Sequence, residues 1–174
     1  ERAVTFLRSG DAATAEKLSR AALEDYPEDP NFLSLLGASL TQLRRAGEAE
    51  TVLRRALASD PEYAKAHEEL GRALLAQERP IEAIEPLRRA FELNPAMESA
   101  QAALSRALVA IGREQEAKEV LDTFLRQQPH RQLLARAAEH QREGRLEQAE
   151  SLYREILRQD PRNVSALRML AVLA

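Results

Sequence analysis

The sequence predicts an all-α chain of about five tandem helix–turn–helix units followed by a final unpaired helix. Three observations predict it: prolines recur at a nearly fixed step, columns of small and large apolar residues keep that step, and the apolar spacing between prolines is helical. The recurring prolines are Pro27, Pro61, Pro95, Pro129 and Pro161, and the last step is slightly shorter than the other three. We therefore expect a single solenoid domain over residues 1–174, with units at 1–27, 28–61, 62–95, 96–129 and 130–161 and a partial unit at 162–174.

Other columns follow the same period. One column of small residues reads Ala15, Ala49, Ala83, Ala117 and Ala149, and a second reads Gly37, Gly71, Ser105, Ala137 and Ala171. A column of large apolar residues reads Leu23, Leu57, Phe91, Leu125 and Leu157. Because added volume overpacks a close helix contact, the small columns indicate where helices approach one another.

Each unit contains two helical patterns. Leu33, Leu36, Gly37 and Leu40 lie at i, i+3, i+4 and i+7, which places them on one face of a helix, and the series that begins at Ala49 repeats this spacing. We expect two helices per unit of roughly 12–14 residues each. We also expect Pro61 and Pro95 to occupy the first helical position behind the cap residues Asp60 and Asn94, where the missing N–H of proline costs nothing.

These columns together resemble the signature of the tetratricopeptide repeat. The matching residues are Leu36-Gly37, Leu40, Ala49, Leu53, Ala56 and Pro61 in one unit, and Leu70-Gly71, Leu74, Ala83, Leu87, Ala90 and Pro95 in the next. The resemblance covers essentially the whole chain. It implies a right-handed superhelical solenoid whose first helices line the concave face, and a role in binding other proteins.

Composition excludes several other classes of protein. The net charge of −3 gives no basic face for nucleic acid, and the lack of cysteine excludes disulfides and thiolate chemistry. No apolar run approaches the roughly 18 residues of a membrane span. The three histidines show no metal-binding or catalytic spacing, and no catalytic or phosphate-binding motif is present. We therefore expect no enzyme activity, cofactor, metal, nucleic-acid partner or membrane insertion.

The resemblance also implies a stripe of residues on the concave face that would contact a bound peptide or partner protein. The stripe consists of Asn31, Ser34, Lys65, Glu68, Arg72, Ser99, Ala102, Arg106, Arg131 and Leu134. The alternative is that these residues form an ordinary solvated helix face. Some members of the family hold the C-terminal carboxylate of chaperone tails with a clamp of Lys, Asn and Arg. In units two to four the corresponding positions are Ser34, Ala38, Glu69, Ser99 and Ala103, which do not match it. In units three to five they are Glu68, Arg72, Ala103, Arg131 and Ala135, where only Arg131 is a partial cationic match, so a chaperone adaptor of that kind is not expected.

Two functions fit this surface. The first is a protein–protein interaction scaffold that binds a peptide or partner in the groove. The second is an N-terminal module that positions a substrate or partner for a larger enzyme, such as a sulfotransferase or glycosyltransferase linked to these repeats. An RNA-binding helical array has a similar period, but the acidic balance disfavours it.

The ends of the sequence lead to further expectations. The last helical pattern has an apolar face with no second helix to cover it, so Leu167, Leu170 and Leu173 are candidates for self-association. We expect the native protein to be a larger bacterial chain that continues in both directions. The sequence does not fix the compartment, and the cytoplasm is the expected one.

Overall fold

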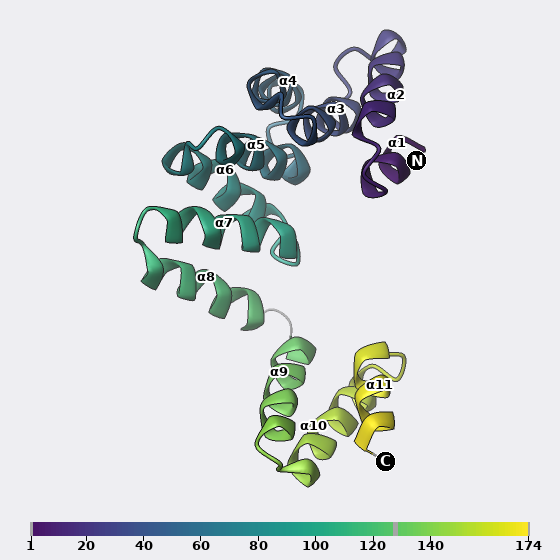
Figure 1. Cartoon of the computed structure of the whole chain (residues 1–174), viewed down its shortest axis with the longest axis vertical. Coiled ribbons are helices and arrows are strands. Elements are labelled where there is room, and N and C mark those ends of the chain that lie inside the picture. The colour runs from purple at the N-terminus through teal and green to yellow at the C-terminus, as the bar shows by residue number, and fades with distance from the viewer. Residues whose placement is uncertain (1, 127–128, 174) are drawn as a thin grey trace. The chain divides into compact units, whose positions relative to one another are not determined.

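In the computed structural model, which describes residues 2–126 and 129–173, all regular structure is helical (Figure 1). Eleven helices lie within these residues. They are α1 (Arg2–Arg8), α2 (Ala12–Asp25), α3 (Pro30–Gln42), α4 (Ala46–Ser59), α5 (Ala64–Ala76), α6 (Pro80–Leu93), α7 (Glu98–Ala110), α8 (Glu114–Arg126), α9 (Pro129–Arg142), α10 (Leu146–Gln159) and α11 (Val164–Leu173). The predicted all-α class is confirmed.

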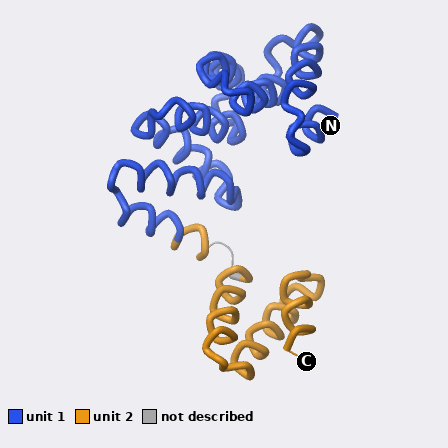
Figure 2. The backbone as a smooth tube through the Cα atoms, viewed as in Figure 1, with its two compact units in different colours: residues 1–121 blue, residues 122–174 orange. Residues whose placement is uncertain are grey.

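The helices form two compact units (Figure 2): unit 1 is Glu1–Leu121 and unit 2 is Asp122–Ala174. Consecutive helices pack as pairs, with α1 on α2, α3 on α4 and α5 on α6 in unit 1, and α9 on α10 in unit 2. The predicted helix pairs are therefore confirmed. The expected single domain over residues 1–174, with its right-handed superhelical path, stays a prediction.

The periodic small residues form the core of unit 1. Ala15, Ala49 and Ala83 are fully buried, and so are large residues of the same pattern such as Leu33 and Leu53. Small and large apolar side chains thus both contribute to this core. Burying a leucine of this kind stabilises the fold by about 1.5–3 kcal/mol.

Two of the recurring prolines do not occupy the position that we predicted. Pro61 lies in a turn that precedes α5, which begins three residues later at Ala64, and Pro95 likewise precedes α7. The Asp60 carboxylate accepts the backbone N–H of Glu62 at 3.0 Å. Asp60 therefore stabilises a turn and does not cap the helix.

Unit 2 has a separate core that gathers α9, α10 and α11. Ala137, Ala149, Tyr153, Ile156 and Ala166 are buried together. Leu170 and Leu173 pack against this cluster and are half-buried, whereas Leu167 is exposed. Of the three leucines expected to form a bare patch, only Leu167 is therefore well exposed to solvent.

Candidate functional site

A hollow of about 810 Å³ opens on the face of unit 1 formed by α1, α3 and α5. Its apolar lining residues are Val4, Leu7, Phe32, Leu35 and Ala38. Its polar and charged lining residues include Asn31, Ser34, Tyr63, Lys65, Glu69 and Arg72. The first helices of three consecutive repeats thus contribute to one groove, which we call the unit 1 groove.

Four charged residues on α5 form an ion cluster at this groove. The Lys65 Nζ atom lies 2.7 Å from Glu68 Oε2 and 2.8 Å from Glu69 Oε1. Arg72 Nη1 lies 3.6 Å from Glu68 Oε1 and 3.7 Å from Glu69 Oε1. Residues at i, i+3, i+4 and i+7 share a helix face, so one helix holds all four charges.

The ion cluster is asymmetric in its burial and in its hydrogen bonds. The side chains of Glu68 and Glu69 are 0% and 5% exposed, whereas those of Lys65 and Arg72 are 44% and 43% exposed. Burial disfavours the charged form of Lys65, but the carboxylates of Glu69 and Glu68 outweigh burial and raise its pKa. Arg72 is too far from either carboxylate for a hydrogen bond, so its guanidinium can donate to a ligand.

Two buried oxygen atoms near the groove have no hydrogen-bond partner among the described residues. They are Ser34 Oγ, which lines the groove, and Glu68 Oε1. A buried polar atom without a partner costs about 1–3 kcal/mol.

A hydrogen bond between repeats shapes the edge of the groove. The Tyr63 hydroxyl donates to Asn31 Oδ1 at 2.7 Å and so joins the start of α5 to the start of α3. Burial raises the pKa of Tyr63. The bond leaves the Asn31 amide nitrogen available as a donor.

The structure distributes the predicted stripe over three environments. Asn31, Ser34, Lys65 and Arg72 line the unit 1 groove, and Glu68 is fully buried on the same helix as Lys65. Ser99, Ala102 and Arg106 lie on the exposed face of α7 and are not part of the groove lining. The remaining two residues belong to unit 2: the Arg131 guanidinium lies 5.3 Å from the centre of the Phe124 ring, and Leu134 packs against the unit 2 core.

Sequence reasoning missed several residues that line the groove. The i, i+4 spacing of Lys65 and Glu69 is that of a helical ion pair, so the sequence alone could have placed Glu69 beside Lys65. Val4 lies one full repeat before Ala38, which also lines the groove, so the repeat period could have identified Val4 as well. Phe32 and Tyr63 carry no such periodic signal.

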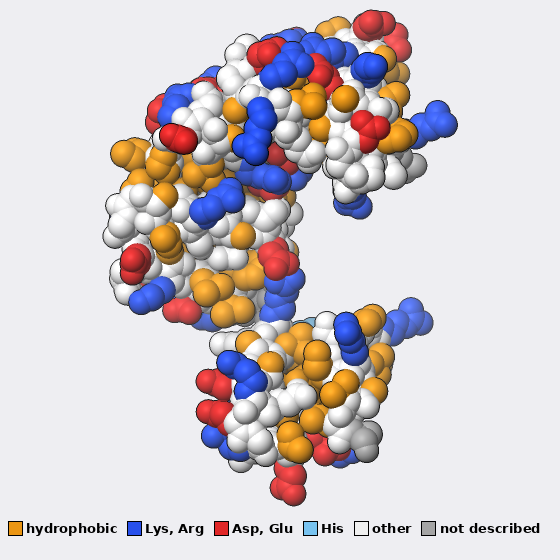
Figure 3. All heavy atoms as spheres, viewed as in Figure 1, with side chains coloured by type: hydrophobic (Ala, Val, Ile, Leu, Met, Phe, Trp, Pro, Cys, Tyr) orange, Lys and Arg blue, Asp and Glu red, His pale blue; other side chains and the backbone are white. Residues whose placement is uncertain are grey.

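On the visible surface, charged and apolar side chains are interspersed (Figure 3).

Metal sites and membrane spans are absent from the part of the chain that the structure describes. Within residues 2–126 and 129–173, no group of three or more acidic or histidine side chains is arranged to hold a metal ion. None of the helices described there has both the length and the apolar composition needed to cross a membrane.

Comparisons with known families and proteins fit this arrangement. Family models described as "Tetratricopeptide repeat" match residues 1–64 and 39–98, residues 74–139 and residues 130–173. No curated protein matches the chain significantly.

Solved structures share the fold. TTC0263, a thermophilic TPR protein of Thermus thermophilus, is 21% identical with a TM-score of 0.65, and the match covers 98% of this chain and 94% of that one. The first TPR of Spaghetti (RPAP3), bound to the HSP90 peptide SRMEEVD, is 22% identical with a TM-score of 0.59 and coverages of 64% and 89%. A mutant O-GlcNAc transferase of Thermobaculum terrenum is 36% identical with a TM-score of 0.58, over 61% of this chain but only 20% of that one.

Proposed function

Because the chain belongs to the tetratricopeptide repeat family, whose domains generally mediate protein–protein interactions, we propose that it is a scaffold that binds a peptide segment of a partner in the unit 1 groove. The observation that carries this proposal is the hollow of about 810 Å³, which is lined by both apolar and polar side chains. Clefts of about 300–1,000 Å³ with a few well-placed polar groups are typical binding sites.

The groove chemistry suggests what the bound segment contains. Lys65 lies within hydrogen-bond distance of Glu68 and Glu69, whereas Arg72 lies 3.6 and 3.7 Å from them, so Arg72 and Arg8 are the cations of the lining whose N–H groups can donate to a ligand. An acidic side chain would form charge-assisted hydrogen bonds with Arg72. An apolar neighbour would pack against Phe32 and Leu35, which line the same groove.

The mode of binding has a precedent among proteins of the same fold. The RPAP3 domain binds the HSP90 peptide SRMEEVD. At 22% identity this similarity supports a peptide-binding mode and not the same ligand. The mismatched clamp positions, including Glu69 and Ser34, disfavour a chaperone tail as the ligand.

A random peptide library displayed on phage and selected on the immobilised chain would test the proposal. Selected peptides would be synthesised and their affinities measured by fluorescence anisotropy. We expect Arg72→Glu to weaken binding by about fivefold or more, because it replaces an attraction with a repulsion. Asn31→Ala should also weaken binding, since it removes a donor from the same groove.

Arg106→Glu supplies the matched control. Arg106 lies one repeat after Arg72 on the same helix face, but it does not line the groove. Its reversal should leave the affinity within about twofold of wild type, the range of an exposed charge. If no peptide is selected, or if Arg72→Glu binds as tightly as wild type, the groove is not the binding site.

A second candidate function has one specific observation in its favour. The O-GlcNAc transferase match is 36% identical and covers a fifth of that enzyme, so a similar repeat array is part of a glycosyltransferase chain. In that role the groove would position a protein substrate for a catalytic domain. The full reading frame of the gene distinguishes the candidates, because the second one requires a catalytic domain in the same chain.

A further inference from the structure

The turns that join the two helices of a repeat share one backbone conformation. In each of the five described turns, the backbone N–H that follows the turn's central residue donates to the carbonyl five residues before it. The central residue has a positive φ, which is 87°, 77° and 76° at Gly10, Gly112 and Gly144, and 63° and 59° at Arg44 and Glu78. Two successive repeats of unit 1 therefore carry a charged side chain where the other three have glycine.

These two side chains occupy an unfavourable backbone conformation. A residue with a Cβ atom is less stable than glycine at a positive φ, because the Cβ crowds the neighbouring carbonyl oxygen. Arg44 and Glu78 are exposed, and neither side chain forms an ion pair or hydrogen bond with another residue that the structure describes. Contacts within the described chain thus do not offset the strain. Strained residues of this kind are often retained where they serve binding.

The same two turns also differ in the size of a second residue. Ile81, three residues after Glu78, is 72% exposed. The equivalent residue one repeat earlier is Gly47, three residues after Arg44, and a Cβ atom built there would meet no atom within 4 Å. One turn thus presents a cation beside an open space, and the next presents an anion beside an apolar projection. We call the surface formed by Arg44, Gly47, Glu78 and Ile81 the turn face.

The turn face is complementary to itself. In a two-fold dimer each contact occurs twice, so a surface that meets its own copy must match itself. If the axis passes between the two turns, Arg44 of one copy meets Glu78 of the other. The same operation places Ile81 of one copy over Gly47 of the other. Because a single operation matches both charge and size, the turn face fits a second copy of this chain.

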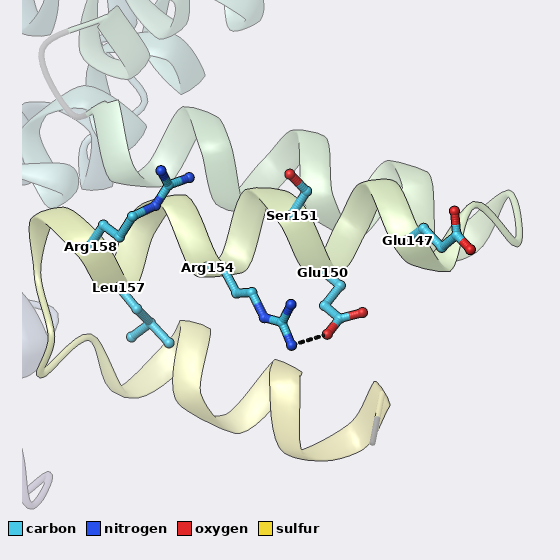
Figure 4. Close-up of a pocket in the computed structure, with 6 residues that line it drawn as sticks. All are labelled: Glu147, Glu150, Ser151, Arg154, Leu157 and Arg158. Atoms are coloured by element: carbon cyan, nitrogen blue, oxygen red, sulfur yellow. Dashed lines mark ion pairs between the residues drawn. The ribbon is translucent and has the colours of Figure 1, made fainter.

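The hollow on α10 offers a contrast. It has a volume of about 500 Å³ and is lined by charged residues that include Glu150 and Arg154. There the Arg154 Nη2 atom lies 2.6 Å from Glu150 Oε1, so these two charges already compensate each other within one helix (Figure 4). Arg154 is therefore a suitable control for the unpaired Arg44.

We propose that the chain forms a two-fold dimer through the turn face, with Arg44 of each copy paired to Glu78 of the other and Ile81 of each copy packed over Gly47 of the other. Because only two turns of each copy take part, the dimer should be weak and in equilibrium with the monomer. The proposal does not depend on the function proposed for the unit 1 groove.

Sedimentation velocity of the full chain tests the dimer. Between about 10 µM and about 1 mM, the average sedimentation coefficient should rise from that of a monomer toward that of a dimer. Arg44→Glu and Glu78→Arg should each weaken the association about tenfold or more, because each places like charges together at both contacts. An equimolar mixture of these two variants should associate as the wild type does, since opposite charges again meet at both contacts.

Three further variants separate the dimer contact from effects on folding. Arg44→Gly removes the charge and relieves the backbone strain, so it should raise the urea midpoint of the chain while it weakens association. Ile81→Ser should also weaken association, whereas Arg154→Glu should leave it unchanged.

Two results would overturn the proposal directly: a sedimentation coefficient that does not rise up to about 1 mM, or a mixture of Arg44→Glu and Glu78→Arg that stays monomeric. A dimer that Leu167→Ser dissociates but Arg44→Glu does not would place the contact on α11, and would equally rule out the turn face.

Discussion

Leu53 lies directly over Gly37, so a Cβ atom added to the glycine would be 2.4 Å from the leucine Cγ. One repeat later, the same construction on Gly71 places its Cβ 2.3 Å from Leu87 Cγ. The two helices of a repeat therefore approach so closely that the leucine occupies the space of a missing side chain. This contact explains the recurring glycine physically, without reference to the family signature.

Replacement of Gly37 by alanine should destabilise the chain by about 1–3 kcal/mol, because the new methyl group overpacks against Leu53. Urea unfolding followed by circular dichroism measures the loss. Gly47→Ala is the matched control, since a Cβ at Gly47 meets no atom within 4 Å and Gly47 lies in a helix. That variant should be neutral or more stable by up to about 1 kcal/mol. Equal stability of the two variants would contradict the close contact.

The sequence predicted that Gly37 and Leu53 face inward, because helix packing recurs in every repeat and imposes a period on the residues that take part. Gly37, Leu53 and Ala56 recur one repeat later as Gly71, Leu87 and Ala90, so their inward direction could be inferred without coordinates. The helix starts after Pro61 and Pro95 could not be inferred in the same way. A proline is compatible with the first helical turn and with a turn that precedes the helix. At Pro61 the Asp60 carboxylate favours the preceding turn by accepting the backbone N–H of Glu62.

The candidate site was less predictable than the fold. The column that contains Ser34, Glu68 and Ala102 is small or polar, so its composition does not distinguish a groove wall from a buried contact. The structure buries Ser34 and Glu68 but exposes Ala102. Burial of Glu68 is possible because Lys65 lies 2.7 Å away, a compensation that depends on side-chain geometry and not on the period.

The pair of Glu50 and Arg79 should make stability depend on pH below neutrality. Burial acts to raise the pKa of Glu50, but hydrogen bonds from Arg54, Gln77 and Arg79 outweigh it and lower the pKa below its ordinary value of 4.5. A lowered folded-state pKa means that the stabilisation is complete above about pH 4.5 and is lost as the pH falls through the folded pKa. Glu50→Gln should therefore lose stability relative to wild type at pH 7, and the loss should shrink as the pH falls below about 4.5.

Urea midpoints measured between pH 3 and pH 7 test this dependence. At pH 7 the loss should be about 1 kcal/mol, because the Glu50 side chain is 16% exposed and the Arg79 side chain 35% exposed. Glu24→Gln, at an exposed position of α2, is the control and should parallel wild type throughout. A constant difference between Glu50→Gln and wild type from pH 3 to pH 7 would show that the pair does not carry the dependence.

Tyr153 should contribute to unit 2 mainly by filling volume. It is 1% exposed within the unit 2 core, and its hydroxyl donates to Gln141 Oε1 at 3.1 Å. Tyr153→Ala should cost about 3–5 kcal/mol through the cavity that it leaves. Tyr153→Phe should cost no more than about 1.5 kcal/mol, because only one hydrogen bond is lost. Similar losses for the two variants, measured by urea unfolding, would assign the stability to the hydrogen bond instead.

Loss of Lys65 should destabilise the chain more than loss of the charges that it neutralises. Lys65→Met leaves the buried carboxylates of Glu68 and Glu69 beside each other, with only the more distant Arg72 to compensate them. Because the Lys65 side chain is 44% exposed, we expect about 2 kcal/mol, less than for a fully buried pair. In the triple variant Lys65→Met, Glu68→Gln and Glu69→Gln, the repulsion is absent, so stability should recover toward wild type. Urea unfolding of the wild type, the single variant and the triple variant measures these differences. If the triple variant were less stable than Lys65→Met, hydrogen bonds to the carboxylates, and not charge compensation, would hold this cluster together.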